Sequence, residues 1–316
     1  MGVDLRIDRW AILVRDLSGQ ELARDRFLPE ANAGAPAVLK GIAGVIKRLT
    51  ANLPHELMGI GVAVGGTPRP DHRGLLRSHY LEWRNVDVQA ILREELQSPD
   101  LQCFVHDVAS CAAEANATIL PNEDRSELLH LQCGIGLGAG EPSPLHVSIP
   151  DAFKTNYIGH LPFGAIEEPC QVCGWKGCVD SVLGFHALVK RTEQLGITVR
   201  ETPDFIIEYC QELVARWEAG DKLAEEIIGD LALDLAKLIV LLIMSKEVSV
   251  ITLGGWSSHL GDRFVTLVED IVRSNRLSSH AKVEVSQSGD DASAIGAAML
   301  GAMVGITARL VKNDPE

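Results

Sequence analysis

Residues 159–180 read GHLPFGAIEEPCQVCGWKGCVD and contain one histidine and three of the chain's seven cysteines. Cys170 and Cys173 form a CxxC pair, and Cys178 follows five residues later. Three thiolates and the imidazole of His160 make a tetrahedral ligand set that is usual for structural zinc. Four protein ligands leave no open coordination position, so the segment predicts a structural metal and not a catalytic one. The alternatives are a group of free thiols or a transient redox CxxC pair.

The same segment resembles the hallmark of the ROK family (repressor, open reading frame, kinase), in which Gly-His precedes CxCGxxGCxE. This chain has one extra residue in the first cysteine spacing, and Asp180 stands where the family has Glu. The resemblance extends over nearly the whole chain, at residues 2–19, 59–86, 104–114, 131–140, 251–256 and 291–298. It implies the actin-like ATPase (ribonuclease H-like) fold of sugar kinases and sugar-sensing repressors, with two α/β domains around a cleft.

The rest of the sequence is typical of an α/β protein, because short apolar runs alternate with helical patterns. The predicted strands lie at 1–14, 57–64, 102–105, 128–133, 248–253 and 282–285. The predicted helices lie at 36–53, 87–96, 107–119, 181–194, 204–217, 222–245, 262–273 and 292–306. We expect an N-terminal domain of residues 1–117, completed by a C-terminal helix at 292–310. Residues 118–291 form the second domain, which carries the zinc segment.

Composition and charge limit the classes of protein that fit. The chain has 316 residues, 46% of them hydrophobic, which is typical of a soluble protein with two domains. A net charge of −14 repels phosphate backbones, so this chain alone is not expected to bind nucleic acid. The N-terminus is charged, and Asp234 and Lys237 interrupt the most apolar stretch, 231–244. We therefore expect a cytoplasmic protein with no membrane partner.

Asp107 is the candidate catalytic base. It follows a short apolar strand and opens a helix, where a carboxylate can accept a proton from a sugar hydroxyl. By resemblance it matches the catalytic Asp of the family's Asn-Asp motif, and His106 replaces the sugar-binding Asn. The alternative is that Asp107 only caps the helix.

Two glycine-rich segments are candidate nucleotide contacts, since glycines let backbone N–H groups approach a phosphate closely. Gly134, Gly136, Gly138 and Gly140 alternate with other residues after the strand at 128–133 and resemble the family's second phosphate loop. Gly254 and Gly255 resemble its adenosine-side turn. An ordinary turn between strands and an ordinary tight connection are the alternatives.

The first phosphate loop departs from the kinases of the family, which carry Asp-x-Gly-Gly-Thr. This chain reads Asp4-Leu5-Arg6-Ile7-Asp8, so side chains replace both glycines and Asp8 adds a negative charge where a triphosphate would lie. Family repressors also lack the glycine pair. An active kinase would need ATP and Mg²⁺, and this loop argues against both.

The sugar pocket implied by the resemblance is also altered. Tyr157 replaces a sugar-binding Glu, Asp180 replaces a second one, and Tyr80 stands where an Asn is usual, whereas Gly66 and His160 remain. Each unpaired replacement costs about 1–3 kcal/mol of binding energy. The implied sugar-binding set is Gly66, His106, Asp107, Tyr157, His160 and Asp180.

Three functions follow from these residues. The first is a regulator-like protein that binds a sugar or another metabolite and has weak or lost kinase activity. The second is an ATP-dependent kinase that phosphorylates a hexose or N-acetylhexosamine with Asp107 as base. The third is a repurposed enzyme that uses the same fold. Family resemblance implies a homodimer in each case, and whether the protein is an enzyme stays open.

Overall fold

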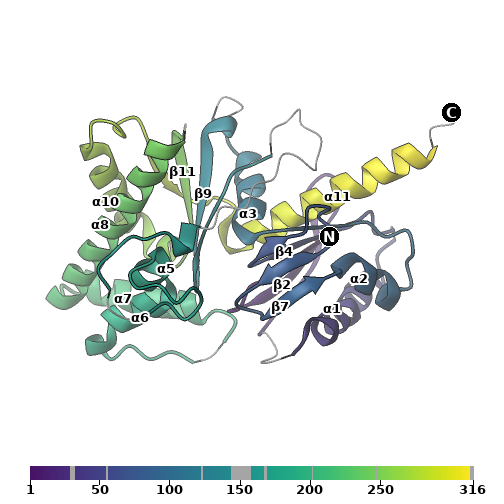
Figure 1. Ribbon diagram of the computed structural model, residues 1–316, viewed down its shortest axis with the longest axis horizontal. Helices are drawn as coiled ribbons and strands as arrows, with labels where there is room; N and C mark the ends of the chain where they lie inside the picture. The colour runs from purple at the N-terminus through teal and green to yellow at the C-terminus, as the bar shows by residue number, and fades with distance from the viewer. Residues whose placement is uncertain are drawn as a thin grey trace. The chain divides into compact units, whose positions relative to one another are not determined.

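The computed structural model in Figure 1 describes residues 1–28, 33–54, 56–121, 124–143, 158–166, 169–200, 202–246 and 248–313. The chain forms two compact units, and it passes between them after Ala115, Pro142, Thr155 and Asp290. The first unit contains Met1–Ala115 and the last helix, and the second contains most of the chain from Asn116 to Asp290. Each unit has its own sheet and its own hydrophobic core.

The first unit contains a five-stranded sheet in the order β3-β2-β1-β4-β8. Its strands are β1 (Gly2–Leu5), β2 (Trp10–Arg15), β3 (Glu21–Phe27), β4 (Ile60–Val64) and β8 (Cys103–His106). β1, β4 and β8 are parallel, whereas β2 and β3 continue the sheet as antiparallel hairpins. A second, small sheet consists of β5 (Thr67–Pro68), β6 (Leu75–Ser78) and β7 (Trp83–Val86). The helices are α1 (Ala35–Thr50), α2 (Val88–Leu96), α3 (Val108–Ala117) and α11 (Ala292–Asn313).

Small residues let α11 lie directly on β1 and β4 (Figure 1). A Cβ atom added to Gly2 would lie 1.8 Å from the carbonyl oxygen of Ala294, and one added to Gly61 would lie 1.7 Å from that of Ala297. Neither glycine can be replaced without moving the helix, because backbone atoms cannot yield as side chains can. The helix continues beyond the predicted residues 292–310 to Asn313.

By length and composition, one helix in the described part of the chain is apolar enough to cross a membrane, at Gly289–Lys312 with a mean hydropathy of 1.7. Sequence reasoning had singled out 231–244 instead. This is weak evidence for a membrane span, because the core helix of a soluble domain meets the same criterion. In the structure, α11 packs on the sheet of the first unit, although only 39% of its most apolar stretch is buried.

The second unit contains a four-stranded sheet in the order β10-β9-β11-β12. Its strands are β9 (Leu128–Cys133), β10 (Leu137–Gly140), β11 (Val250–Gly255) and β12 (Lys282–Val285). The α-helices are α5 (Val179–Leu183), α6 (Phe185–Arg191), α7 (Phe205–Glu218), α8 (Lys222–Ser245), α9 (Trp256–His259) and α10 (Gly261–Ser274). Short 3-10 helices are η1 (Arg125–Glu127), η2 (Ile158–His160) and η3 (Glu193–Leu195), and η4 (Gly289–Asp291) leads into α11.

Several predicted elements differ from those observed. The predicted helix 181–194 is divided into α5, α6 and η3, because the backbone is extended at Gly184 and a side chain there would meet Ile135 and Asp180. The segment 1–14 forms two strands joined by a turn. The glycines at 134–140 form a hairpin turn followed by the strand β10, not one continuous loop. Sequence reasoning missed β3 and β5–β7 altogether.

Candidate functional site

The four predicted zinc ligands lie together in the second unit. Their ligand atoms are all within 4.8 Å of one another, and His160 Nδ1 lies 3.9 Å from Cys170 Sγ. His160 is the last residue of η2, and Cys178 stands directly before α5. Separations of this size between donor atoms are what a tetrahedral ion with bonds of about 2.0–2.3 Å requires. The donor set and its geometry therefore fit a zinc ion.

Two glycines in left-handed conformations shape this cluster. Gly174 has φ +75° and its N–H donates to the carbonyl of Cys170, which closes the CxxC turn. Gly177 has φ +68°, and a Cβ there would lie 1.8 Å from the carbonyl oxygen of Gly164. The Gly177 carbonyl in turn accepts the N–H groups of Phe163 and Gly164. These contacts fold the cysteine segment back onto the residues after His160.

The surroundings of the cluster act on its thiols in different directions, because burial raises the pKa of Cys178 to about 11. Burial alone would raise the pKa of the Cys170 thiol, but hydrogen bonds from the N–H groups of Cys173 and Val172 hold that pKa below its ordinary value. Asp180 accepts the N–H of Leu137 through Oδ1 at 2.7 Å, and its Oδ2 lies 3.7 Å from His160 Nδ1. Asp180 therefore lies beside the same ring nitrogen that faces Cys170, and not beside the other ring nitrogen, where the supporting contact of a metal-bound imidazole is made. Asp180, predicted as a sugar ligand, therefore lies beside a predicted zinc ligand.

The first loop of the chain is occupied by its own side chains. Asp4 is completely buried at the end of β1, and its Oδ2 accepts the Ser293 hydroxyl at 2.7 Å. Arg6 follows in the turn, with Nε 3.3 Å from Asp4 Oδ2 and a terminal nitrogen 3.8 Å from Asp8. Burial raises the pKa of the Asp4 carboxyl, and the charges of Arg6 and Arg9 oppose that shift. The guanidinium of Arg6 thus lies where the family's kinases have glycines.

Asp107 sits at the carboxyl end of β8 and makes two local contacts. Its Oδ1 accepts the N–H of Ser110 at 2.9 Å, so it caps α3, and its Oδ2 lies 2.7 Å from His106 Nδ1. Burial would raise the pKa of Asp107, but the His106 charge and these hydrogen bonds hold it below its ordinary value. Helix capping, one of the two interpretations of this residue, is therefore observed.

Sequence reasoning missed His72, which belongs to the same cluster. Its ring stacks on Phe104 with centroids 4.6 Å apart and on His106 with centroids 5.3 Å apart. Burial lowers the pKa of His72, which favours its neutral form. No local motif marks His72, since the turn between β5 and β6 brings it to β8.

The remaining residues of the predicted sugar-binding set differ in what the structure shows of them. Gly66 packs against β6, because a Cβ there would lie 2.4 Å from the Arg77 carbonyl oxygen. This close packing accounts for the glycine without a ligand. Tyr157 lies outside the described residues. Asp4, Gly66 and Asp107 all stand at or just after the carboxyl ends of the parallel strands β1, β4 and β8, the edge where α/β sheets bind ligands.

In the second unit, the candidate nucleotide glycines lie at the ends of β9 and β11. Gly134 donates to the carbonyl of Gly136 in the hairpin turn, and Gly138 pairs with Gln132 as a strand residue. Gly254 and Gly255 end β11; Gly255 has φ +72°, and a Cβ there would lie 2.0 Å from the Cys133 carbonyl oxygen.

A buried polar network that the sequence did not indicate lies beneath these two glycines. His130 Nδ1 is 3.0 Å from Thr252 Oγ1 and 3.4 Å from Asn116, and its Nε2 is 3.2 Å from Gln132. Asn116 Oδ1 also accepts the Ser286 hydroxyl at 3.0 Å. These hydrogen bonds join β9, β11 and the residue after β12, and so hold the Gly254–Gly255 end of the sheet in place.

Comparison with known proteins agrees with the family resemblance over nearly the whole chain. The family model described as "ROK family" matches residues 1–303. A xylose repressor from Caldicellulosiruptor bescii is 21% identical over 314 residues, which cover 94% of this chain and 76% of the repressor.

Two solved structures share the fold. A ROK family glucokinase from Streptomyces griseus, in complex with glucose and AMPPNP, has a TM-score of 0.76 at 20% identity and covers 96% of this chain and 98% of its own. A ROK family transcriptional regulator, a homologue of the E. coli Mlc protein, has a TM-score of 0.75 at 18% identity. The match covers 98% of this chain and 79% of the regulator. The predicted actin-like ATPase fold is confirmed. With its family model matched over nearly its full length, the chain belongs to the ROK family.

Proposed function

We propose that this chain is a regulator-type ROK protein, which binds a sugar or a related metabolite and transfers phosphate weakly or not at all. The contact between Arg6 and Asp4 carries this proposal. In the family's kinases, glycines at this turn allow close approach of a phosphate. Here the guanidinium of Arg6, whose side chain is only 11% exposed, occupies the turn. Ile7 replaces the second glycine with an exposed side chain, and Asp8 adds a negative charge.

The capping role of Asp107 supports the same proposal. Its Oδ1 accepts the N–H of Ser110, whereas its Oδ2 is buried without a hydrogen-bond partner among the described residues. A carboxylate whose pKa is lowered is also a weaker general base. The amide that the family uses to hold the sugar beside this residue is replaced by His106, whose side chain is completely buried.

A structural zinc ion would be held by His160, Cys170, Cys173 and Cys178. When bound, it would tie the cysteine segment to η2 and fix the orientation of the His160 ring. If Nδ1 of His160 binds the ion, its Nε2–H remains a donor for a ligand hydroxyl. Relatives that include a xylose repressor and a glucose-bound kinase support a sugar as the ligand class.

The second candidate is an ATP-dependent kinase that phosphorylates a hexose or an N-acetylhexosamine. The position of Asp107 at the carboxyl end of β8 favours it, because a base there stands at the ligand-binding edge of the sheet. The Gly134–Gly136 turn and the Gly254–Gly255 end of β11 would be its nucleotide contacts. ATP and Mg²⁺ would then be its cofactors.

Phosphorus NMR of the zinc-loaded protein with Mg-ATP separates the two candidates. The panel contains hexoses and N-acetylhexosamines, and each sugar is also tested alone by its effect on the melting temperature. We expect at least one sugar to raise the melting temperature without producing a sugar-phosphate signal.

Two variants make the result unambiguous. A sugar-phosphate signal that Asp107→Ala abolishes and Asp270→Ala retains would establish the kinase and overturn the proposal. Asp270 is the matched control, since it is an exposed carboxylate on α10. Failure of every sugar to change the melting temperature would instead remove sugar binding from the proposal.

A further inference from the structure

His72 combines a left-handed backbone with a buried side chain. Its φ is +53°, in the region that favours glycine, and the residue is only 5% exposed. In the described part of the chain, three other non-glycine residues have a positive φ, namely Glu82, Asn85 and Gln97, and all three are exposed. A buried residue keeps such a conformation only where its surroundings fix it, so the contacts of His72 need an explanation.

The backbone and the ring of His72 both contact β8, the last strand in the order of the five-stranded sheet. The carbonyl of His72 accepts the N–H of Val105 at 2.7 Å, and Nδ1 of its ring lies 3.2 Å from the Val105 carbonyl oxygen. A carbonyl oxygen can only accept, so Nδ1 of His72 must carry a hydrogen. Burial lowers the pKa of His72, which keeps the ring neutral. His72 is therefore a neutral ring in a fixed orientation at the edge of the sheet.

The ring of His72 packs against two side chains of β8. Phe104 and His106 are two residues apart in this strand and so point to the same side. The ring centroid of His72 lies 4.6 Å from that of Phe104 and 5.3 Å from that of His106, and the planes are tilted by only 5° and 18°. His106 is completely buried. A flat, neutral ring stacked on His106 restrains its orientation and disfavours a positive charge on it.

The orientation of His106 matters because its Nδ1 faces two groups of Asp107. The backbone N–H of Asp107 donates to Nδ1 at 2.7 Å, and Oδ2 of the same residue also lies 2.7 Å from Nδ1. One ring nitrogen cannot accept and donate at the same time. A neutral ring with its hydrogen on Nε2 accepts the N–H, whereas a protonated ring would donate to Oδ2. Oδ2 is buried without a hydrogen-bond partner among the described residues, which matches the neutral ring.

We propose that His72 is a positioning residue of the ligand site at the carboxyl end of β8. It holds His106 in the neutral form that accepts the N–H of Asp107, and so leaves Asp107 Oδ2 to a hydrogen-bond donor of the ligand. A carboxylate or phosphate would be repelled by this oxygen, whereas a sugar hydroxyl would satisfy it. His72 acts on a ligand in this way only if the proposed sugar binding holds.

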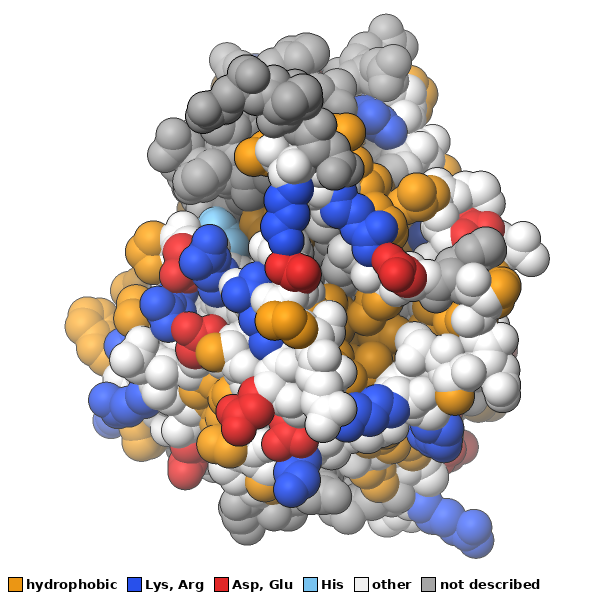
Figure 2. Space-filling model, turned by 90° about the vertical axis from the view of Figure 1, so that its right-hand side faces the viewer, with side chains coloured by type: hydrophobic (Ala, Val, Ile, Leu, Met, Phe, Trp, Pro, Cys, Tyr) orange, Lys and Arg blue, Asp and Glu red, His pale blue; other side chains and the backbone are white. Residues whose placement is uncertain are grey.

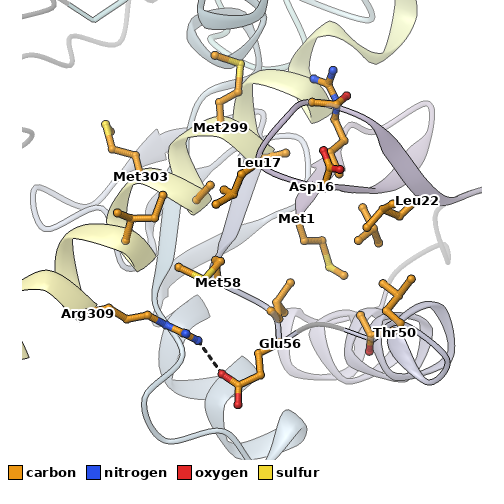
Figure 3. A pocket seen from close by; sticks show the side chains of 18 of the residues that line it. Met1, Asp16, Leu17, Leu22, Thr50, Glu56, Met58, Met299, Met303 and Arg309 are labelled. Atoms are coloured by element: carbon orange, nitrogen blue, oxygen red, sulfur yellow. Dashed lines mark hydrogen bonds and ion pairs between the residues drawn. The ribbon is translucent and has the colours of Figure 1, made fainter.

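A pocket of about 850 Å³ beside α11 is the competing place for a ligand in the first unit (Figure 3). Met1, Leu17, Met58 and Met303 are among the side chains that line it. Figure 2, which views the molecule from the side where α11 ends, shows hydrophobic side chains in the hollows of this surface. Such a lining offers few donors and acceptors to a sugar, and the pocket contains none of the predicted sugar ligands. The polar groups at the end of β8 therefore suit a sugar better.

His72→Gly removes the ring without straining the backbone, because glycine readily adopts a positive φ. Long-range proton–nitrogen NMR of the imidazole rings in the zinc-loaded protein measures the effect, and His106→Gln identifies the signals of His106. The wild type should show a bare Nδ1 and a protonated Nε2 in His106, and His72→Gly should move the two nitrogen signals toward each other. His280→Gly, at an exposed position before β12, is the control and should change neither.

Ligand affinity tests the same link independently. For the hexose or N-acetylhexosamine that raises the melting temperature most, His72→Gly should weaken binding by about 10-fold, the equivalent of one lost hydrogen bond. His72→Phe should restore the affinity to within about 3-fold of the wild type, since a flat ring again packs on His106. A residue that only stabilised its turn would not show this rescue, because phenylalanine relieves no backbone strain. The melting temperature of each variant shows that it is folded.

The proposal is overturned if His106 is protonated in the wild type at neutral pH, or if its ring signals are unchanged in His72→Gly. It is also overturned if Met303→Trp, which would fill the pocket, abolishes sugar binding while His72→Gly retains it at full strength. If no sugar binds to the wild type, the proposed function fails, and the ring signals of His106 alone decide the role of His72.

Discussion

The zinc segment and the first loop respond to sequence change in opposite ways. In the zinc segment one residue is inserted between two cysteines, yet all four ligand side chains still converge. In the first loop the chain keeps its Asp4, but the guanidinium of Arg6 occupies the turn after it and Ile7 replaces the second glycine. A metal site depends on the donors alone and tolerates a longer loop, whereas a phosphate turn depends on the absence of side chains. The first therefore keeps its four donor side chains, whereas the second no longer has a turn free of side chains.

Loss of a zinc ligand should give the largest effect. Cys173→Ser should release the metal and lower the free energy of unfolding by several kcal/mol, on the order of 5, because zinc binding contributes to folding directly. Metal analysis and thermal denaturation measure both effects. Cys210→Ser is the control, since Cys210 is buried outside the cluster, and it should retain one zinc per chain. Zinc retained in Cys173→Ser would contradict the assignment of this ligand.

Removal of the arginine in the first loop should give the next largest effect. Arg6→Ala leaves the buried carboxylate of Asp4 without its nearest cation and should cost about 3 kcal/mol. The double variant Arg6→Ala/Asp4→Asn should recover most of this loss in denaturant unfolding. Arg77→Ala, at an exposed position of β6, should change little. Equal losses in the single and double variants would show that Arg6 does not act through Asp4.

Two glycines of the zinc segment should differ in their tolerance of a side chain. Gly174→Ala should cost about 1 kcal/mol, because it only strains a left-handed residue in open space. Gly177→Ala should cost about 3 kcal/mol, since its Cβ would also collide with the Gly164 carbonyl. Chemical denaturation of the zinc-loaded variants measures the difference. Equal losses would mean that the segment can shift away from Gly164.

The smallest effect should be an opposite pH dependence of two carboxyls in the first unit. The pKa of Asp4 is raised, so its contribution to stability is present at low pH and is lost as the pH rises. The pKa of Asp107 is lowered, so its contribution is present above the ordinary Asp pKa and is lost as the pH falls. Relative to wild type, Asp4→Asn should gain stability and Asp107→Asn should lose it from about pH 3 to about pH 7.

Melting temperatures measured across that range show whether the stability of each variant, relative to wild type, rises or falls with pH. The same sign for both variants would show that burial, which acts on both carboxyls, outweighs the local contact with His106.

Much of the secondary structure follows from the sequence where patterns are strong. The helix 222–245 and the strand 282–285 were predicted at their observed bounds, because Asp221 caps the first and apolar residues alternate in the second. β3 was missed because Glu21–Phe27 carries four charged residues. Its pairing with β2 and the contacts of Arg24 and Arg26 with Asp291 hold it in the sheet.

Part of the candidate site could also be predicted from the sequence. The convergence of the four predicted zinc ligands could be predicted from their types and spacing, and the presence of a side chain in the first turn from two missing glycines. The stacking of His72 on His106 could not be predicted, because the two residues are far apart in the chain and meet only when the turn between β5 and β6 reaches β8. The contact of Asp180 with the N–H of Leu137 could not be predicted either, because these two residues are also far apart in the chain.

By itself, the sequence determined the fold class, the family, the four donors of the metal site and the departure of the first loop. Each of these depends on residue types that stand close together in the chain, and such patterns can be read directly from the sequence. Only the tertiary structure decided that Arg6 contacts Asp4, that Gly66 is required by packing, and that His72 stacks on His106. Contacts between distant segments exist only after the sheet has brought their backbones together, so no local pattern could specify them.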